Sequence, residues 1–176
     1  MPSLMCSSAF AADINPFSDL TAFNYFVDQG GLKSIAQINQ DGPDNFSEIN
    51  QISDPSSALG NFAEIFQTGS SNEAHVKQDG QINKVTINQT GTDNYAITDQ
   101  AGTANSIVLT QSGDGNTFAG NQYGTFNSIE VIQPGSALST ITINGNHNAV
   151  TLNQKFRGEY NITLTSDNMI YTVTQR

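Results

Sequence analysis

An eleven-residue repeat runs through this 176-residue chain and restricts the folds open to it. Glutamine recurs at this spacing seven times, at Gln67, Gln78, Gln89, Gln100, Gln111, Gln122 and Gln133. Asparagine recurs six times, at Asn72, Asn83, Asn94, Asn105, Asn116 and Asn127. The unit is Asn, five residues, Gln, and then four residues that usually carry Gly in second place. Such regular self-similarity is typical of repeat proteins, in which each unit packs on its neighbours.

The residues between Asn and Gln alternate in polarity with a period of two. The third and fifth positions hold apolar residues such as Val85 and Ile87, whereas charged residues such as Lys84 and Glu130 occupy even positions. Asp167 is the one charged residue of the predicted strands that breaks this parity. A helix, with its period of about 3.6 residues, would scatter the same charges around its circumference, so the pattern predicts β-strands.

Thirteen seven-residue arms can be marked out from Ser34 onward. They are 34–40, 45–51, 61–67, 72–78, 83–89, 94–100, 105–111, 116–122, 127–133, 137–143, 148–154, 161–167 and 169–175. Two arms joined by a short Gly-bearing link make one rung of about 22 residues, and stacked rungs give two facing parallel sheets. The predicted fold is therefore an all-β, two-sheet β-solenoid, an amyloid-like stack of about six and a half rungs over residues 34–176. Its inward Asn and Gln would form amide ladders, because an unpaired buried amide costs about 1–3 kcal/mol.

Several links depart from the repeat. The link over 52–60 is enlarged by five residues, and the link after Gln133 is shortened. Ile143 stands where a Gln is expected. With an arm at 161–167, the link after Gln154 is two residues longer than usual and the last link nearly vanishes. We interpret these places as surface loops that the stack tolerates.

The composition excludes several classes of protein. With 36% apolar residues and no Trp, the sequence cannot build a large conventional core. A net charge of −10 has the wrong sign for binding nucleic acid. No apolar run is long enough to span a membrane.

The N-terminal segment does not follow the repeat. Residues 1–12 are small and apolar and end in Ala-Phe-Ala-Ala, which predicts the remnant of a secretory signal peptide cleaved after Ala12. Cleavage there removes Cys6, the only cysteine, so that neither disulfides nor zinc could brace the mature protein. Residues 13–33 could form a short amphipathic helix over Phe23 and Val27 that caps the first rung, or a flexible export leader, which is the favoured interpretation.

The residues that could carry chemistry give weak signals. His75 falls on an outward strand position and His147 in a turn, which favours two solvated side chains over a metal or catalytic pair. Asp79, Asp93 and Asp114 stand near glycines but lack the nonapeptide pattern of calcium-binding β-rolls, so they are interpreted as turn residues. The sequence predicts no catalytic residue, no metal site and no cofactor.

The links and flanking amides resemble a known family. Gln78-Asp79-Gly80-Gln81-Ile82-Asn83 and its counterparts at 89–94 and 100–105 are similar to the curlin repeat of bacterial curli subunits, and the resemblance covers residues 34–176. It implies a secreted structural subunit of extracellular amyloid fibres, a fimbrium-like polymer that supports biofilm matrix and cell adhesion. The implied partners are copies of the protein itself, a companion curli subunit, and the curli secretion channel and chaperones met in transit through the periplasm.

Two segments bear on the kind of curlin subunit. Residues 19–27 and the ending 173–176 look more like the minor, nucleating curlin subunit than the major one, whose leader is Gly-rich. The later repeats of the minor subunit are usually more basic than those of this sequence, so the major subunit stays as the alternative.

The last arm predicts a bare strand edge at the C-terminal end of the stack. It runs to Gln175, one residue before Arg176, so no residues remain to cover it. An uncovered edge that repeats the template of its own rungs should add further copies of the protein end to end. The predicted polymerisation edge consists of Met169, Tyr171, Val173 and Gln175.

Four other residues are predicted to act as gatekeepers that slow premature aggregation during export. They are Asp93, Asp99, Asp114 and the inward Gly120.

A ligand-binding solenoid and a solenoid enzyme would each need a residue pattern that this sequence lacks. A secreted solenoid that binds ice or polysaccharide is the alternative, but it would need a regular outward row of Thr or aromatic side chains. The outward positions instead mix residues such as Lys84, Tyr95 and Val108. A solenoid hydrolase would need converging inward carboxylates, and the predicted inward positions carry none before Asp167, so the protein is not expected to be an enzyme.

Overall fold

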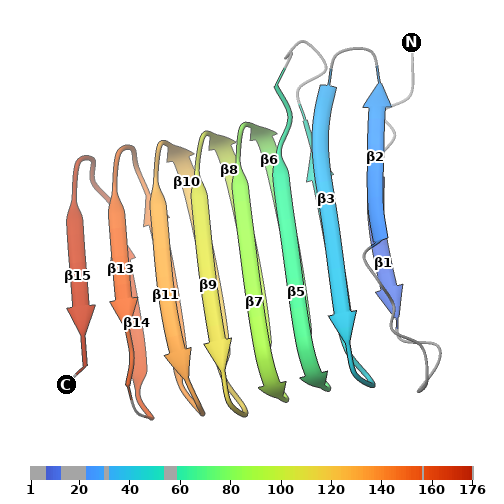
Figure 1. Cartoon of the computed structure of the whole chain (residues 1–176). Coiled ribbons are helices and arrows are strands. Elements are labelled where there is room, and N and C mark those ends of the chain that lie inside the picture. The colour runs from blue at the N-terminus through green and yellow to red at the C-terminus, as the bar shows by residue number, and fades with distance from the viewer. Residues whose placement is uncertain (1–6, 13–22, 30–31, 54–58, 156, 176) are drawn as a thin grey trace.

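The computed structural model describes residues 7–12, 23–29, 32–53, 59–155 and 157–175, which form two facing β-sheets (Figure 1). Sheet A has seven strands in the spatial order β1 (Ser7–Ala12), β4 (Phe46–Ile52), β6 (Glu73–Gln81), β8 (Tyr95–Thr103), β10 (Thr117–Thr125), β12 (Leu138–Asn144) and β14 (Glu159–Leu164). Sheet B has eight, in the order β15 (Ile170–Thr174), β13 (Ala149–Asn153), β11 (Ser128–Pro134), β9 (Ser106–Ser112), β7 (Lys84–Thr92), β5 (Phe62–Ser70), β3 (Leu32–Asp41) and β2 (Phe23–Gln29). Among the described residues there is no helix long and apolar enough to cross a membrane.

Parallel strand pairing builds the stack from β3 to β15. The backbone changes sheet at every strand, so each strand pairs with the strand two places along. Gln78 of β6 pairs with Gln100 of β8, and Gln67 of β5 pairs with Gln89 of β7, a step of 22 residues in both sheets. The predicted all-β, two-sheet β-solenoid with 11-residue half-repeats is confirmed, and each predicted arm overlaps one of the strands β3 to β15.

The core is the thin layer between the two sheets. Burial alternates along the strands, as in β7, where Val85 and Ile87 are fully buried and Thr86 between them is not. Equivalent positions carry Ile107 and Leu109 in β9, and Phe118 in β10 is among the largest fully buried side chains. Because successive side chains of a strand point to opposite faces, the two-residue pattern of the sequence places every apolar pair against the opposite sheet.

The links between strands explain the recurring glycine. Gly80 and Gly102 have φ angles of 113° and 120°, a left-handed backbone conformation that side chains disfavour. A Cβ atom added to Gly80 would also collide with the carbonyl oxygen of Gly102 in the next rung. A second left-handed residue precedes each of the next strands, such as Ile82 with φ of 58° and Ala104 with φ of 57°. Two left-handed residues therefore turn the backbone from one sheet to the other.

One predicted arm is wrong by three residues. β14 pairs with β12 so that Leu138 lies beside Glu159 and Ile143 beside Leu164, which places the true arm at 158–164 instead of 161–167. Since side chains alternate with a period of two, a shift by an odd number exchanges the faces. Ile162 and Leu164 are accordingly buried, whereas Asn161, which was expected to point inward, is exposed.

The same shift corrects the last two links. Only three residues separate Gln154 from Gly158, where the arm of β14 begins, and residues 165–168 form a link of ordinary length, the reverse of what the sequence predicted. Asp167 lies in that second link and is exposed, so the predicted inward charge is wrong. The predicted arm begins at Asn161 because the regular repeats begin with Asn. The apolar alternation of Tyr160, Ile162 and Leu164 indicates the true register.

The N-terminal strands run against the direction of the stack. β2 pairs with β3 and β1 pairs with β4, both antiparallel. The helix considered for residues 13–33 is wrong over 23–29, which form β2, and residues 13–22 and 30–31 lie outside the described part of the protein. The segment 23–29 holds three aromatic residues and Val27, which suit an extended strand beside an open sheet edge.

Candidate functional site: amide ladders and sheet edges

Glutamine side chains form one continuous ladder in each sheet. Each side chain donates from Nε2 to Oε1 of the equivalent Gln in the next rung toward the C-terminus. In sheet A the donor–acceptor pairs are Gln51 to Gln78 at 2.8 Å, Gln78 to Gln100 at 2.9 Å and Gln100 to Gln122 at 2.8 Å. In sheet B they are Gln40 to Gln67 at 2.6 Å, Gln67 to Gln89 at 2.7 Å, Gln89 to Gln111 at 2.9 Å and Gln111 to Gln133 at 3.0 Å. The ladder therefore has a direction.

The same glutamines also tie the two sheets together. Gln78 of sheet A donates to the backbone oxygen of Phe62 in sheet B at 3.0 Å, and Gln89 of sheet B donates to that of Glu73 in sheet A at 3.0 Å. Each Nε2 group has two hydrogens, so one can serve the ladder and the other the facing strand. Such fully paired amides can be buried at low cost in free energy.

Asparagine side chains form ladders with the opposite direction of donation. Asn94 donates from Nδ2 to Oδ1 of Asn72 in the preceding rung at 2.9 Å, and its backbone N–H donates to the same oxygen at 3.2 Å. Asn72 donates in turn to Asn45 at 3.0 Å and to the backbone oxygen of Gly91 at 3.0 Å. Each such Asn is held from both neighbouring rungs, which fixes the turn that starts the next strand.

All thirteen Gln and Asn residues singled out in the sequence are at most 1% exposed. The sequence pattern missed further members of the ladders at Gln40, Gln51, Asn45 and Asn61. They stand at the same arm positions, and the enlarged link over 52–60 breaks the eleven-residue spacing between Gln40, Asn45 or Gln51 and the later members. Asn61 follows that link and keeps the eleven-residue spacing from Asn72, so the repeat itself was the signal that could have found it.

The glutamine ladders stop before the C-terminal end. Gln122 Nε2 is buried with no hydrogen-bond partner among the described residues, since Ile143 occupies the next position. In sheet B, Gln133 donates to Ser139 Oγ at 3.1 Å, and Gln154 Oε1 is left unpaired in the described part of the structure. At the opposite end Gln40 Oε1 is also buried without a donor among these residues.

Strands β14 and β15 are the outermost described strands at the C-terminal end, one in each sheet (Figure 1). Of the predicted edge, Met169 is 42% exposed and Tyr171 is 45% exposed, while Val173 packs partly against the core. The backbone N–H of Gln175 donates to Asn153 O at 3.0 Å, which places Gln175 beside Gln154. The four residues thus lie on the last strand of sheet B and its continuation.

The three predicted acidic gatekeepers lie in different settings. Asp99 points outward from β8, with its Oδ2 3.5 Å from Lys77 Nζ of β6. Asp93 is the left-handed link residue before Asn94, with φ of 56°. Asp114 Oδ1 accepts the backbone N–H of Thr92 in the preceding link at 2.9 Å. Two of the three therefore belong to links, as the turn interpretation predicted, and their effect on aggregation stays a prediction.

Gly120 makes room for an aromatic ring. A Cβ atom at this position would lie 2.6 Å from two ring atoms of Phe118 and 3.5 Å from Ile107 Cδ1. The absence of a side chain thus accommodates the largest apolar residue of β10 in a thin core, a packing reason that the sequence did not reveal.

The two histidines lie apart. His75 on the outer face of sheet A places Nδ1 3.3 Å from Glu48 Oε2 and Nε2 2.6 Å from Glu73 Oε1. His147, in a link, stacks on Phe126 with the ring centroids 5.2 Å apart. Among the residues described, no group of three or more His, Cys, Asp or Glu side chains could hold a metal ion.

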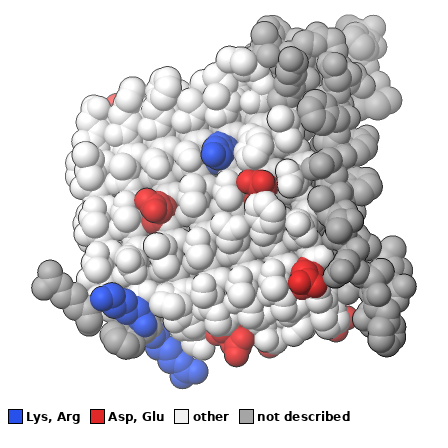
Figure 2. All heavy atoms as spheres, viewed as in Figure 1, with Lys and Arg blue, Asp and Glu red and all other residues white. Residues whose placement is uncertain are grey.

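The outer face of sheet B carries few charges (Figure 2). One row across its strands runs from Thr86 to Val108, Glu130 and Thr151, and Glu130 is exposed. This row lacks the regular spacing of Thr or aromatic side chains that an ice- or polysaccharide-binding face would need.

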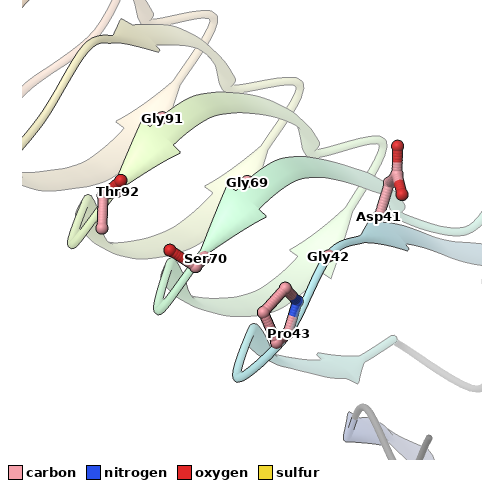
Figure 3. Close-up of a pocket in the computed structure, with 7 residues that line it drawn as sticks. All are labelled: Asp41, Gly42, Pro43, Gly69, Ser70, Gly91 and Thr92. Atoms are coloured by element: carbon pink, nitrogen blue, oxygen red, sulfur yellow. The ribbon is translucent and has the colours of Figure 1, made fainter. Parts of the chain in front are cut away.

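A shallow groove crosses the links at the N-terminal end of the stack (Figure 3). Its walls are formed by Asp41, Gly42, Pro43, Gly69, Ser70, Gly91 and Thr92. The carbonyl oxygens of Gly69 and Gly91 already accept Nδ2 of Asn45 and Asn72, at 2.9 and 3.0 Å. The groove therefore reflects the stacked glycines and offers few free polar groups to a ligand.

Taken together, the geometry defines a two-sheet parallel β-solenoid whose buried polar groups serve the stacking of rungs. The family model for the Curlin associated repeat matches residues 60–91 and 91–124, which span strands β5 to β10. The match extends over a little more than a third of the sequence and supports the curlin family, which consists of structural amyloid subunits and is not a family of enzymes. Comparisons with curated proteins and with solved structures gave no match.

Proposed function

We propose that this protein is a structural subunit of curli-type extracellular amyloid fibres and that it polymerises end to end through the edges of its rungs. The observation that carries the proposal is the pair of directional amide ladders, which repeat every 22 residues and give the interior rungs the same template. A rung that pairs with its neighbour inside the molecule presents the same groups to a rung of another copy.

The sheet edges supply the contact surface. An edge strand exposes a row of backbone N–H and C=O groups that can pair with another molecule, and a long uncovered edge favours association. β14 and β15 occupy such edges in the described structure, and Ile170 of β15 is 81% exposed. Assembly through these strands needs no chemical step, in agreement with a protein whose repeats are those of a structural family.

Similarity to curlin repeats supports a place outside the cell. On this proposal the protein crosses the periplasm, with the curli secretion channel and chaperones as transit partners, and joins fibres on the cell surface that strengthen biofilm matrix and adhesion. The small apolar segment before Asp13 supports export.

We further propose the nucleating role, with a companion major subunit as partner. Its support is the resemblance of residues 19–27 and 173–176 to the minor curlin subunit. Trace amounts of this protein should then abolish the lag phase of a companion subunit while the protein polymerises poorly alone. Robust growth alone, with no effect on the companion's lag, would assign it to the major subunit.

Thioflavin fluorescence of the purified protein, followed over time with electron microscopy of the product, tests the general proposal. Growth after a lag that seeds of the same protein shorten is the expected result. A protein that stays monomeric both alone and with a companion subunit would overturn it, and binding of that monomer to ice or polysaccharide would establish the alternative.

A further inference from the structure

We propose that β2 is a displaceable cap on the N-terminal end of sheet B, and that β15 of a second copy replaces it on β3, with Gln175 of that copy above Gln40. The inference rests on the proposed end-to-end assembly. It adds that the edge of β3 receives the incoming copy, that β15 of that copy occupies this edge, and that the pairing of β2 with β3 controls access to it.

Gln40 supplies the first observation. The residue is only 5% exposed, and its Nε2 donates to Gln67 Oε1 at 2.6 Å, so it is the first rung of the sheet B ladder. Every later Oε1 from Gln67 to Gln133 accepts Nε2 of the preceding Gln. Gln40 Oε1 has no donor among the described residues. A buried acceptor without a donor is unfavourable, so this oxygen marks where one more ladder member would bind.

The pairing of β2 supplies the second observation. β2 runs antiparallel to β3, and its pairing ends with Phe23 beside Ile38, two residues short of Gln40. The other strand pairs in sheet B, from β3 to β15, are parallel and in register. β2 therefore covers the backbone edge of β3 but does not continue the ladder, so a parallel strand bearing Gln has an advantage over it.

The opposite end of the same sheet carries a strand that meets this need. Sheet B ends at β15, whose register with β13 places Thr174 beside Asn153 and hence Gln175 beside Gln154. A copy of β15 laid on β3 with the same register brings Gln175 Nε2 toward Gln40 Oε1. In sheet B, the last strand of one copy would then lie beside the first repeat strand of the next, as neighbouring repeat strands lie beside each other within one molecule.

The apolar positions also match in size. In this register Tyr171 of the incoming copy lies beside Ala36, and Val173 lies beside Ile38. Tyr171 is 45% exposed at its inward position, whereas Ala36 is small and packs partly against the core. Docking would bury the exposed ring over the small residue, which favours association through the hydrophobic effect.

The exchange has a consequence for control. While β2 stays in place, the backbone groups of β3 are paired and the N-terminal end is closed to unrelated strands. A strand gains over β2 only if it pairs with the backbone of β3 and also supplies a donor to Gln40 Oε1, which has none among the described residues. The cap thus favours pairing of β3 with β15 of another copy over pairing with the edge strands of unrelated proteins.

A reversible lock tests the displacement. Asn24 and Gln37 lie opposite each other in β2 and β3, at a separation suited to a disulfide across antiparallel strands. The full-length protein with Cys6→Ser, Asn24→Cys and Gln37→Cys is expected to stay monomeric when oxidised and to grow fibres once a reductant is added. The readouts are thioflavin fluorescence and sedimentation.

A matched control carries Cys6→Ser, Thr86→Cys and Val108→Cys, which would join neighbouring strands inside sheet B. Its growth should be the same with and without reductant. Equal growth of the oxidised and reduced β2 lock would overturn the displacement and leave the proposed assembly standing. Failure of the unmodified protein to grow both alone and with a companion subunit would overturn both.

A second measurement needs no variant. Hydrogen exchange read by mass spectrometry should show residues 23–29 protected in the monomer and exchanging freely in the fibre, with β3 protected in both. Retained protection of residues 23–29 in the fibre would contradict the exchange of strands.

Discussion

The interior rungs, formed by β5 to β11, and the terminal rungs, formed by β12 to β15, share a backbone geometry but differ in what fills the ladder positions. In the interior every rung carries the inward amides, and Gln100 is paired with a glutamine on either side. In the terminal rungs of sheet A, Ile143 and Leu164 stand at the glutamine position. The parallel sheets continue across this change, so the ladder is not required for two rungs to stack.

The difference separates two tasks that the repeat performs. Aliphatic residues suffice to hold rungs together, because Ile143 is fully buried between its neighbours. The amides add register, since a strand that slips along the stack would leave buried donors and acceptors unpaired. A region without ladders should therefore tolerate substitution and strand exchange more readily than the interior.

The largest expected effect is the loss of an interior glutamine. Gln100→Met should lower the free energy of unfolding by about 3 kcal/mol, because it removes the acceptor of Gln78 and the donor to Gln122 in a buried site. Gln154→Met, in a terminal rung where Oε1 is already unpaired among the described residues, should cost about 1 kcal/mol. Denaturant unfolding of dilute monomer measures both, and equal losses would contradict the comparison.

The next largest effect concerns side-chain packing in the interior rungs, for comparison with the loss of a ladder glutamine. Gly120→Ala should destabilise by about 2 kcal/mol, because the added methyl group meets the ring of Phe118 at 2.6 Å. Combining it with Phe118→Leu should recover part of the loss, a non-additivity that a double-mutant cycle detects. If the pair of changes is strictly additive, steric contact is not the reason for glycine at this position.

A smaller gain is expected in an interior link. Ile82 is β-branched and has φ of 58°, a conformation that Asn adopts more readily. Ile82→Asn should raise the free energy of unfolding by about 0.5–1 kcal/mol. Ile132→Asn serves as a control, because Ile132 is exposed to a similar degree on strand β11 outside the left-handed region. A gain at both positions would point to the more polar surface as the cause.

The smallest effect concerns the outer face of the interior rungs. Burial and then the negative charge of Asp99 raise the pKa of Tyr123 above its ordinary value of 10.0. The folded state therefore holds this proton more tightly than the unfolded state, so its contribution to stability is present below pH 10.0 and declines as the pH rises above that value. Asp99→Asn should lower the pKa of Tyr123 in a phenolate absorbance titration, whereas an unchanged or higher pKa would exclude the carboxylate as a cause.

The sequence predicted most of the fold wherever the spacing was regular. From Gln67 to Gln133 the strict interval indicated strand positions, faces and register together, because in-register stacking needs chemically equivalent residues at equal intervals. It failed at residues 158–164, where Gly158 replaces the initial Asn and Asn161 supplies a misleading one. There the aliphatic alternation was the better guide to register.

Other features could not be inferred from one repeat unit. The pairing of β2 with β3 depends on an edge that exists only after the stack has formed, so neither the flexible leader favoured for residues 13–33 nor the alternative helix anticipated a strand at 23–29. The packing reason for Gly120 likewise depends on the position of the Phe118 ring in the assembled core. The missing donor to Gln40 Oε1, among the described residues, becomes evident only when the direction of the ladder is known.

The opposed directions of the Gln and Asn ladders have an electrical consequence. Each regular rung, such as β7 with β8, contains two glutamines whose amide carbonyl bonds point toward the preceding rung and two asparagines whose amide carbonyl bonds point toward the following one. Their dipole moments along the stack therefore largely cancel within every rung, unlike the aligned peptide dipoles of an α-helix, which sum along its length. Lengthening such a column accumulates no large dipole from its amides, so this source of polarisation sets no limit on how many rungs can be added.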